Sequence, residues 1–66
     1  YENIDLSKAI DSLNAELRLT IVLFYFEDLT ISEIANMLNI PEGTVKSRLS
    51  RAKGKIAYYL GEREVL

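Results

Sequence analysis

The sequence contains no cysteine and no histidine, and it has only one proline and three glycines. Without cysteine there is no disulfide framework and no thiolate metal site, and without histidine the commonest general base and metal ligand is missing. The one adjacent acidic pair, Glu27 and Asp28, does not make a carboxylate dyad, because neighbouring residues on a helix do not face each other. No apolar run approaches the roughly 20 residues that cross a membrane. We therefore expect neither an enzyme nor a membrane protein, and no metal, cofactor or small-molecule substrate.

The length of 66 residues suits one small domain, because a chain of this size buries only about 60% of its unfolded surface. Hydrophobic residues make up 48% of the chain and charged residues 27%, a balance typical of folded domains. The first residue is tyrosine rather than methionine, and we expect residues 1–66 to be a single domain of a longer protein. No signal peptide is visible, so the expected location is the cytoplasm.

The charged residues are distributed unevenly along a chain whose net charge is −2. Residues 1–42 contain eight acidic and two basic side chains, whereas residues 43–61 contain five basic side chains and no acidic one. The five bases are Lys46, Arg48, Arg51, Lys53 and Lys55. Because a phosphate backbone responds to the local field rather than to the total charge, this segment is a candidate for binding nucleic acid.

Apolar residues at helical spacing predict four helices, over about residues 6–13, 15–26, 30–38 and 42–60, and therefore an all-α fold. Asp5 and Asn14 are candidate N-caps of the first two helices. Thr30 and Glu33 have the spacing of a capping box, which marks the start of the third helix. Asn39, a residue that tolerates the left-handed conformation, follows the third helix, and Gly61 follows the fourth.

The turn between the third and fourth predicted helices is short and covers about residues 39–41. Two helices joined by three or four residues form the helix-turn-helix unit, which many DNA-binding domains contain. Ala35 is small where the two helices should cross, and Val45 has the position to pack back against the third helix. An ordinary helical hairpin in an all-α domain has the same spacing, so the turn alone does not decide in favour of DNA binding.

The fourth predicted helix has an apolar face and an opposite face of small polar and basic residues, at about 100° per residue. The apolar stripe, which we expect to face the core, consists of Val45, Leu49, Ala52, Ile56, Tyr59 and Leu60. The outward face begins with Lys46, Ser47, Ser50 and Arg51. Small side chains let a helix approach base edges in the major groove, where Arg, Lys and Ser can form hydrogen bonds.

Three further bases, Arg48, Lys53 and Lys55, flank the apolar stripe, where they can reach phosphates. The alternative is that all five bases form only a solvated surface, although such surfaces usually mix both signs of charge.

The second predicted helix is apolar almost all round from Leu19 to Phe26. Such a helix is either fully buried or docks against another molecule, and a domain of this size can hardly cover every side of it. We therefore predict a protein-docking patch at Val22, Leu23 and Phe26. The alternative is that the first helix and the chain ends cover these residues.

Glu33-Ile34-Ala35, and the run of residues 40–52, Ile-Pro-Glu-Gly-Thr-Val-Lys-Ser-Arg-Leu-Ser-Arg-Ala, resemble region 4 of the extracytoplasmic-function sigma factors of bacterial RNA polymerase. The resemblance extends over nearly the whole chain, from residue 6 to residue 60. It implies recognition of the −35 promoter element in double-stranded DNA as part of polymerase holoenzyme. It also implies two protein partners, the flap of the β subunit of core RNA polymerase and an anti-sigma factor.

The resemblance also implies roles for individual residues of the predicted helix-turn-helix. By position, the family's base-facing residues correspond to Lys46, Ser47, Ser50 and Arg51. Its phosphate-contacting turn and helix start correspond to Pro41, Gly43 and Thr44, with auxiliary phosphate contacts at Arg48 and Lys53. The chain departs from the common pattern at Asn39, where glycine is frequent, at Ala15, where many relatives have proline, and at Ser50, where some have a larger side chain.

Two other functions fit parts of the same pattern. A helix-turn-helix output domain of a response regulator also carries an Ile-Ala and Thr-Val-Lys pattern, but the Ser-Arg-Leu-Ser-Arg-Ala continuation favours the sigma factor. A module that chiefly binds proteins, such as an anti-sigma factor target, would explain the apolar second helix.

Overall fold

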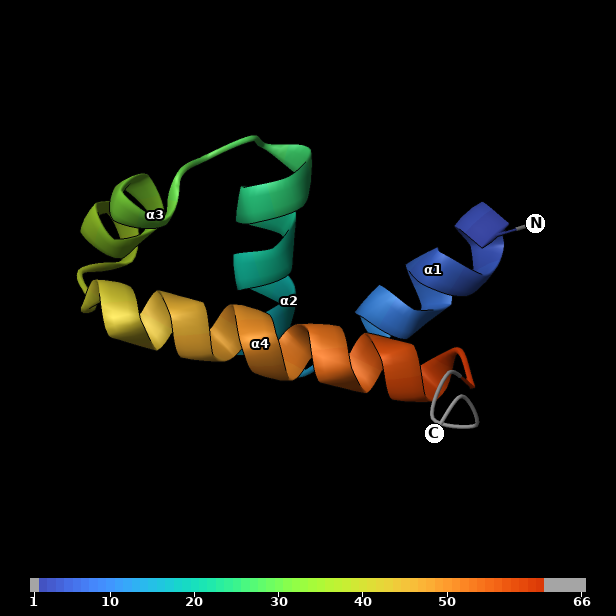
Figure 1. Ribbon diagram of the computed structural model, residues 1–66. Coiled ribbons are helices and arrows are strands. Elements are labelled where there is room, and N and C mark those ends of the chain that lie inside the picture. The colour runs from blue at the N-terminus through green and yellow to red at the C-terminus, as the bar shows by residue number, and fades with distance from the viewer. Residues whose placement is uncertain (1, 62–66) are drawn as a thin grey trace.

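Four helices make up the architecture, in the order α1 (Glu2–Asp11), α2 (Ala15–Ile21), α3 (Ile31–Leu38) and α4 (Glu42–Tyr59), and a π-helical turn, η1 (Val22–Phe26), continues α2. The computed structural model describes residues 2–61, with side chains for residues 6–61. In Figure 1, α4 runs along the length of the molecule, α3 packs near its first turns, α1 lies near its last turns and α2 crosses between them. The described residues contain no strand, which confirms the predicted all-α fold.

The ends of α2 and α3 are held by the side chains that the sequence indicates. The Asn14 side-chain oxygen accepts a hydrogen bond of 2.9 Å from the backbone N–H of Leu17 and caps α2. At the start of α3, the N–H of Glu33 donates to the Thr30 hydroxyl (3.0 Å), and the N–H of Thr30 donates to the Glu33 carboxylate (2.8 Å). This is a complete capping box, so both predicted helix starts are confirmed.

The turn between α3 and α4 is short because two residues adopt the conformations that such a turn needs. Asn39 has the left-handed conformation, with a φ of 58° and a ψ of 48°, as predicted for a residue that ends a helix. The N–H of Ile40 then donates to the Ala35 carbonyl at 3.0 Å. Pro41 is extended, and its carbonyl accepts from the N–H groups of Thr44 (3.0 Å) and Val45 (3.3 Å). The chain therefore enters α4 directly after leaving α3.

The first helix begins earlier than the sequence pattern predicts. It starts at Glu2, so Asp5 lies inside α1 rather than at its N-cap, and it ends at Asp11 rather than at Leu13. The prediction is wrong here because periodicity detects a helix only where apolar residues recur, and residues 2–5 contain only one apolar residue. Beyond the helix end, Arg18 Nη1 donates to the carbonyl oxygens of Asp11 (3.1 Å) and Leu13 (3.2 Å), which joins the α1–α2 connection to α2.

The second predicted helix is not α-helical throughout. Its last five residues form η1, in which the N–H of Glu27 donates to the carbonyl of Val22 at 3.0 Å. A hydrogen bond that spans five residues winds the chain more widely than an α-helix does. Side chains in η1 therefore point in other directions than an α-helical wheel places them. Asp28 follows in a left-handed conformation, with a φ of 63°.

The core lies where α2 and α3 pack against the first half of α4. Val45 and Ala52 are completely buried and Leu49 nearly so, which confirms that part of the predicted stripe. Ile56 is only partly buried, and Tyr59 and Leu60 are 50% and 39% exposed, so the stripe is wrong at its C-terminal end. The reason is that a helical side chain is buried only where other elements cover it. Both α2 and α3 pack along the earlier turns of α4, whereas only α1 lies near its last turns (Figure 1). The buried core residues are Ile10, Leu13, Leu17, Ile21, Ile34, Ala35, Val45, Leu49 and Ala52.

Candidate nucleic-acid interface

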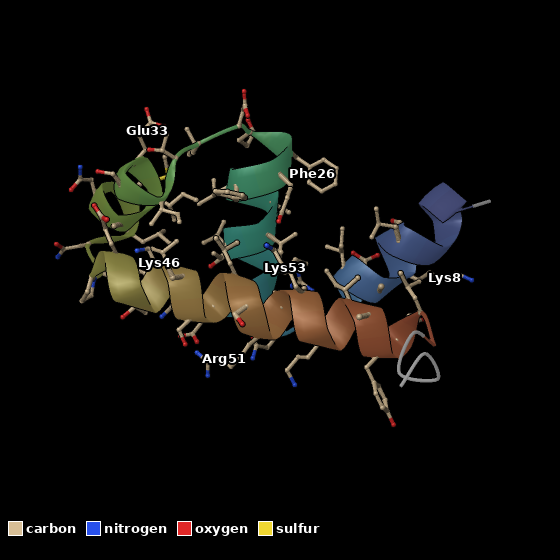
Figure 2. All side chains as sticks on the ribbon, in the orientation of Figure 1. Lys8, Phe26, Glu33, Lys46, Arg51 and Lys53 are labelled. Atoms are coloured by element: carbon tan, nitrogen blue, oxygen red, sulfur yellow. The ribbon has the colours of Figure 1, made fainter. Side chains whose placement is uncertain are left out.

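The outward face of α4 is formed by four exposed side chains within its first ten residues, namely Lys46, Ser47, Ser50 and Arg51. At about 100° per residue, the two serines lie between the two bases. Figure 2 shows Lys46 and Arg51 on opposite edges of this face. The face therefore has short side chains along its middle and long cationic side chains at its edges. Such a surface can come close to base edges while the longer side chains reach out to either side.

The start of α4 stands next to this face. Pro41 and Gly43 are exposed, and Thr44 is half-buried. A methyl group placed on Gly43 would meet no atom within 4 Å, so the fold of this chain does not itself require a glycine there. Its effect is to leave the backbone bare at a helix start, where N–H groups without intrahelical partners and the helix dipole favour a phosphate. Glu42, the one acidic side chain on α4, opposes this preference.

Two of the five bases turn away from the outward face. The Arg48 side chain is only 18% exposed, and its Nη2 lies 3.7 Å from Oε2 of Glu16 on α2. The Nζ of Lys53 lies 5.7 Å from the centroid of the Tyr25 ring in η1, within the range of a cation–π interaction. The structure therefore brings Lys46 and Arg51 together with the serines, and it places Arg48 and Lys53 against α2 and η1.

The predicted docking patch is divided by the π-helical turn. Val22 and Leu23 are half-buried, and Leu23 packs against the core, whereas Phe26 is 61% exposed. Phe26 instead borders an apolar depression of about 330 Å³ between α1, η1 and the last turns of α4. The depression is lined by Leu6, Ile10, Ile21, Tyr25, Phe26, Lys53, Ile56, Ala57 and Leu60. Sequence reasoning missed most of these residues, because they come from three separate segments.

Two further findings concern the part of the chain that the structure describes. No helix within it has the length and apolarity needed to span a membrane. Residues 6–61 also contain no group of three or more acidic side chains placed to hold a metal ion.

The α3–turn–α4 unit, with a short turn and an exposed polar and basic face on its second helix, makes this a helix-turn-helix domain. A family model described as sigma-70, region 4, matches residues 4–56. The chain therefore belongs to the sigma-70 region 4 family. This decides against the response-regulator alternative and agrees with the resemblance carried by residues 40–52.

Several curated relatives are similar over most of the chain. The ECF RNA polymerase sigma factor SigE of Mycolicibacterium smegmatis is 40% identical over 58 residues, which cover 88% of this chain and 23% of that protein. The RNA polymerase sigma factor SigV of Bacillus subtilis is 42% identical over 52 residues, covering 79% of this chain and 31% of that protein. The ECF RNA polymerase sigma factor SigM of Mycobacterium tuberculosis is 38% identical over 58 residues, covering 88% and 30%. The chain is thus a region 4 domain of the ECF type, and it spans less than a third of the length of each of these relatives.

Proposed function

We propose that this domain binds the −35 element of double-stranded promoter DNA, within a sigma factor that directs RNA polymerase to promoters for transcription initiation. The observation that carries the proposal is the outward face of α4, where Lys46, Ser47, Ser50 and Arg51 are all exposed on the second helix of a helix-turn-helix unit. Arg and Lys are suited to guanine edges, and serine can donate or accept a hydrogen bond. The four side chains together supply the base contacts.

Phosphate contacts fix the register of such a helix on the duplex. We propose that the exposed backbone around Pro41 and Gly43, with the half-buried Thr44, binds one phosphate. Arg48 and Lys53 have a smaller part in this proposal than the sequence pattern suggests. Each already has a partner within the domain, Glu16 and Tyr25 respectively, and would have to leave it to reach DNA.

Selection of bound sequences tests the proposed function. Full-length protein in complex with core RNA polymerase is incubated with duplexes that carry a randomised segment upstream of a fixed start region, and the retained DNA is sequenced. We expect enrichment of one short motif at the spacing of a −35 element. If an active complex retained DNA with no enriched motif, the proposal that α4 reads the base sequence would be contradicted. A full-length protein in which both Lys46 and Arg51 are replaced by alanine should lose the enrichment.

The apolar depression beside Phe26 supports a second part of the proposal. We propose that the flap of the β subunit of core RNA polymerase docks there. The depression lies along residues 53–57 of α4 and Leu60 just after it, whereas the outward face lies along residues 46–51, so DNA and polymerase can bind at the same time. Exposed aromatic side chains such as Tyr25 and Phe26, 51% and 61% exposed, are typical anchors of protein interfaces.

The substitution Phe26→Glu tests this docking surface. Burying a charge in an apolar contact should weaken the binding of full-length protein to core RNA polymerase at least about tenfold, as expected for an aromatic anchor worth more than about 1.4 kcal/mol. Leu19→Glu is the matched control, because Leu19 is 45% exposed on α2 and does not line the depression. Equal polymerase binding by the two variants would contradict the proposal. Loss of anti-sigma factor binding alone would assign the surface to the inhibitor instead.

A further inference from the structure

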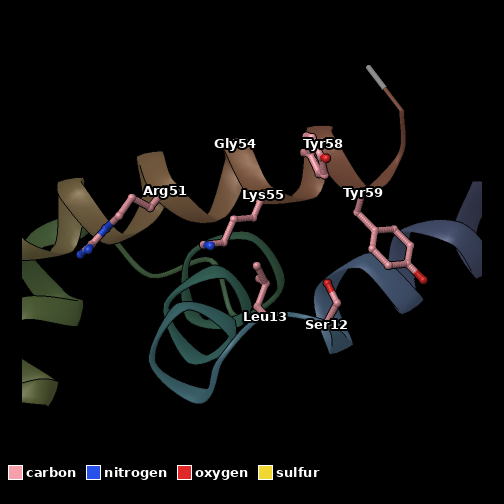
Figure 3. Close-up of a pocket in the computed structure, with 7 residues that line it drawn as sticks. All are labelled: Ser12, Leu13, Arg51, Gly54, Lys55, Tyr58 and Tyr59. Atoms are coloured by element: carbon pink, nitrogen blue, oxygen red, sulfur yellow. The ribbon is translucent and has the colours of Figure 1, made fainter. Parts of the chain in front are cut away.

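A second depression, of about 860 Å³, lies between the C-terminal half of α4 and the end of the α1 region (Figure 3). The residues around it are Ser12, Leu13, Arg51, Gly54, Lys55, Tyr58 and Tyr59. Two of them are cationic and none is acidic. Arg51 lies at one edge of the outward face, and it also lines this depression.

Arg51 and Lys55 are one helical turn apart, so they lie on the same side of α4. In Figure 3 both side chains extend toward the N-terminal half of the helix, the direction in which helical side chains normally lean. Beside Arg51, on the side away from Lys55, the helix surface is bare at Gly54, which is exposed and where a methyl group would meet no atom within 4 Å. The depression thus offers two positive charges beside an accessible stretch of backbone.

The opposite wall would repel an anion if its carbonyl groups were left unpaired, since the C-terminal end of a helix carries partial negative charge. Arg18 pairs two of these carbonyl groups. Its Nη1 donates to the carbonyl oxygens of Asp11 and Leu13, at 3.1 and 3.2 Å. The Arg18 guanidinium group is thus held at the α1–α2 connection, next to Leu13, but it does not itself line the depression.

The length of α4 exceeds the width of the major groove, so a helix placed in the groove also passes the DNA backbone. The helix has 18 residues, which at 1.5 Å per residue is about 27 Å, whereas the major groove is about 12 Å wide. If residues 46–51 lie in the groove, the second half of the helix must leave it and pass a phosphate strand. Lys55 lies nine residues after Lys46, about 13.5 Å along the axis.

We infer that Lys55 binds a backbone phosphate in this depression, together with Arg51, so that the DNA interface extends one helical turn beyond the base-reading face. The inference rests on the proposed function, because it assumes that the outward face of α4 enters the groove. The sequence pattern places Lys55 only among three bases that flank the apolar stripe, and the position-by-position resemblance does not include it. The depression now distinguishes it from Arg48 and Lys53, which have partners within the domain. Such a contact would raise affinity for DNA of any sequence.

The test compares Lys55→Gln with unmodified full-length protein, and with Lys8→Gln as a control that removes the same charge from an exposed position on α1. Binding to the selected duplex and to a random duplex is measured by fluorescence anisotropy over a salt series. Losing one phosphate contact should make the slope of log K against log salt shallower by about 0.9. At 0.15 M salt this corresponds to a roughly fivefold loss of affinity on both duplexes. Lys8→Gln should keep the slope of the unmodified protein.

A second measurement locates the phosphate. Single phosphates of the selected duplex are replaced one at a time by uncharged methylphosphonates. One replacement, outside the base-read segment, should weaken binding of the unmodified protein but not of Lys55→Gln, because the two changes remove the same contact. Equal salt slopes for Lys55→Gln and unmodified protein, or no such phosphate, would overturn the inference. The inference would also be overturned if Lys55→Gln weakened binding to a protein partner and left DNA binding unchanged. Absence of sequence selection by the unmodified protein would instead contradict the proposed function, and the random duplex still tests Lys55.

Discussion

The replacement Arg51→Ala should lower the affinity of the full-length protein for its selected duplex about 10- to 100-fold. A good two-pronged contact to a base is worth about 1 to 3 kcal/mol, and Arg51 combines an exposed position on the outward face of α4 with a place at the neighbouring depression. Because its side chain is exposed, the loss should not come from unfolding, since most surface substitutions change stability by less than about 0.5 kcal/mol. Fluorescence anisotropy with the selected duplex and a thermal melt measure the two effects separately.

The variant Arg51→Lys separates base reading from charge. Lysine keeps the positive charge but cannot form the planar two-pronged contact of a guanidinium group. We expect this variant to keep the salt dependence of binding and to discriminate less between the selected and a mismatched duplex. Equal discrimination by Arg51→Lys and unmodified protein would mean that Arg51 contributes only charge. If Arg51→Ala bound the selected duplex with unchanged affinity, Arg51 would not contact the DNA.

The second large effect concerns the contact between the two helices of the helix-turn-helix unit. Ile34 on α3 and Val45 on α4 are both completely buried. The substitution Ile34→Ala should cost about 2 to 5 kcal/mol, from lost burial and the cavity left behind. A domain of this size has only about 3 to 5 kcal/mol of stability from its core. We expect the melting temperature of the 66-residue chain to fall by more than about 10 °C.

Met37→Ala on the same helix is the matched control for Ile34→Ala. Met37 is 60% exposed, so the same kind of truncation should leave the melting temperature nearly unchanged. Circular dichroism at 222 nm during heating follows both variants. Similar melting of Ile34→Ala and Met37→Ala would mean that the contact between α3 and α4 does not hold the unit together.

The sequence predicts those parts of the structure that depend on nearby residues. The caps at Asn14 and Thr30, and the left-handed Asn39, need only side-chain and backbone groups a few residues apart. The outward face of α4 is predicted equally well, because the exposure of Lys46 and Arg51 follows from helical periodicity and from the buried stripe opposite.

The missed features depend on groups that are distant in the sequence or on a change of helix type. Arg48 was predicted as an auxiliary phosphate contact. Its ion pair with Glu16, 3.7 Å away on α2, was not predicted, because no local pattern links residues 16 and 48. The docking patch was predicted on an α-helical wheel, whereas η1 is π-helical. That turn leaves Phe26 exposed and Leu23 against the core.

The sequence by itself determined the all-α fold, the short turn before α4 and the grouping of Lys46, Ser47, Ser50 and Arg51 on one face. Each of these follows from periodicity, capping or charge within a single segment. Only the tertiary structure decided which bases have partners within the domain, because the packing of α2 and η1 against α4 pairs Arg48 with Glu16 and places Lys53 over Tyr25. It also decided the surroundings of Lys55, since the depression beside it forms where Ser12 and Leu13, which follow α1, meet the second half of α4.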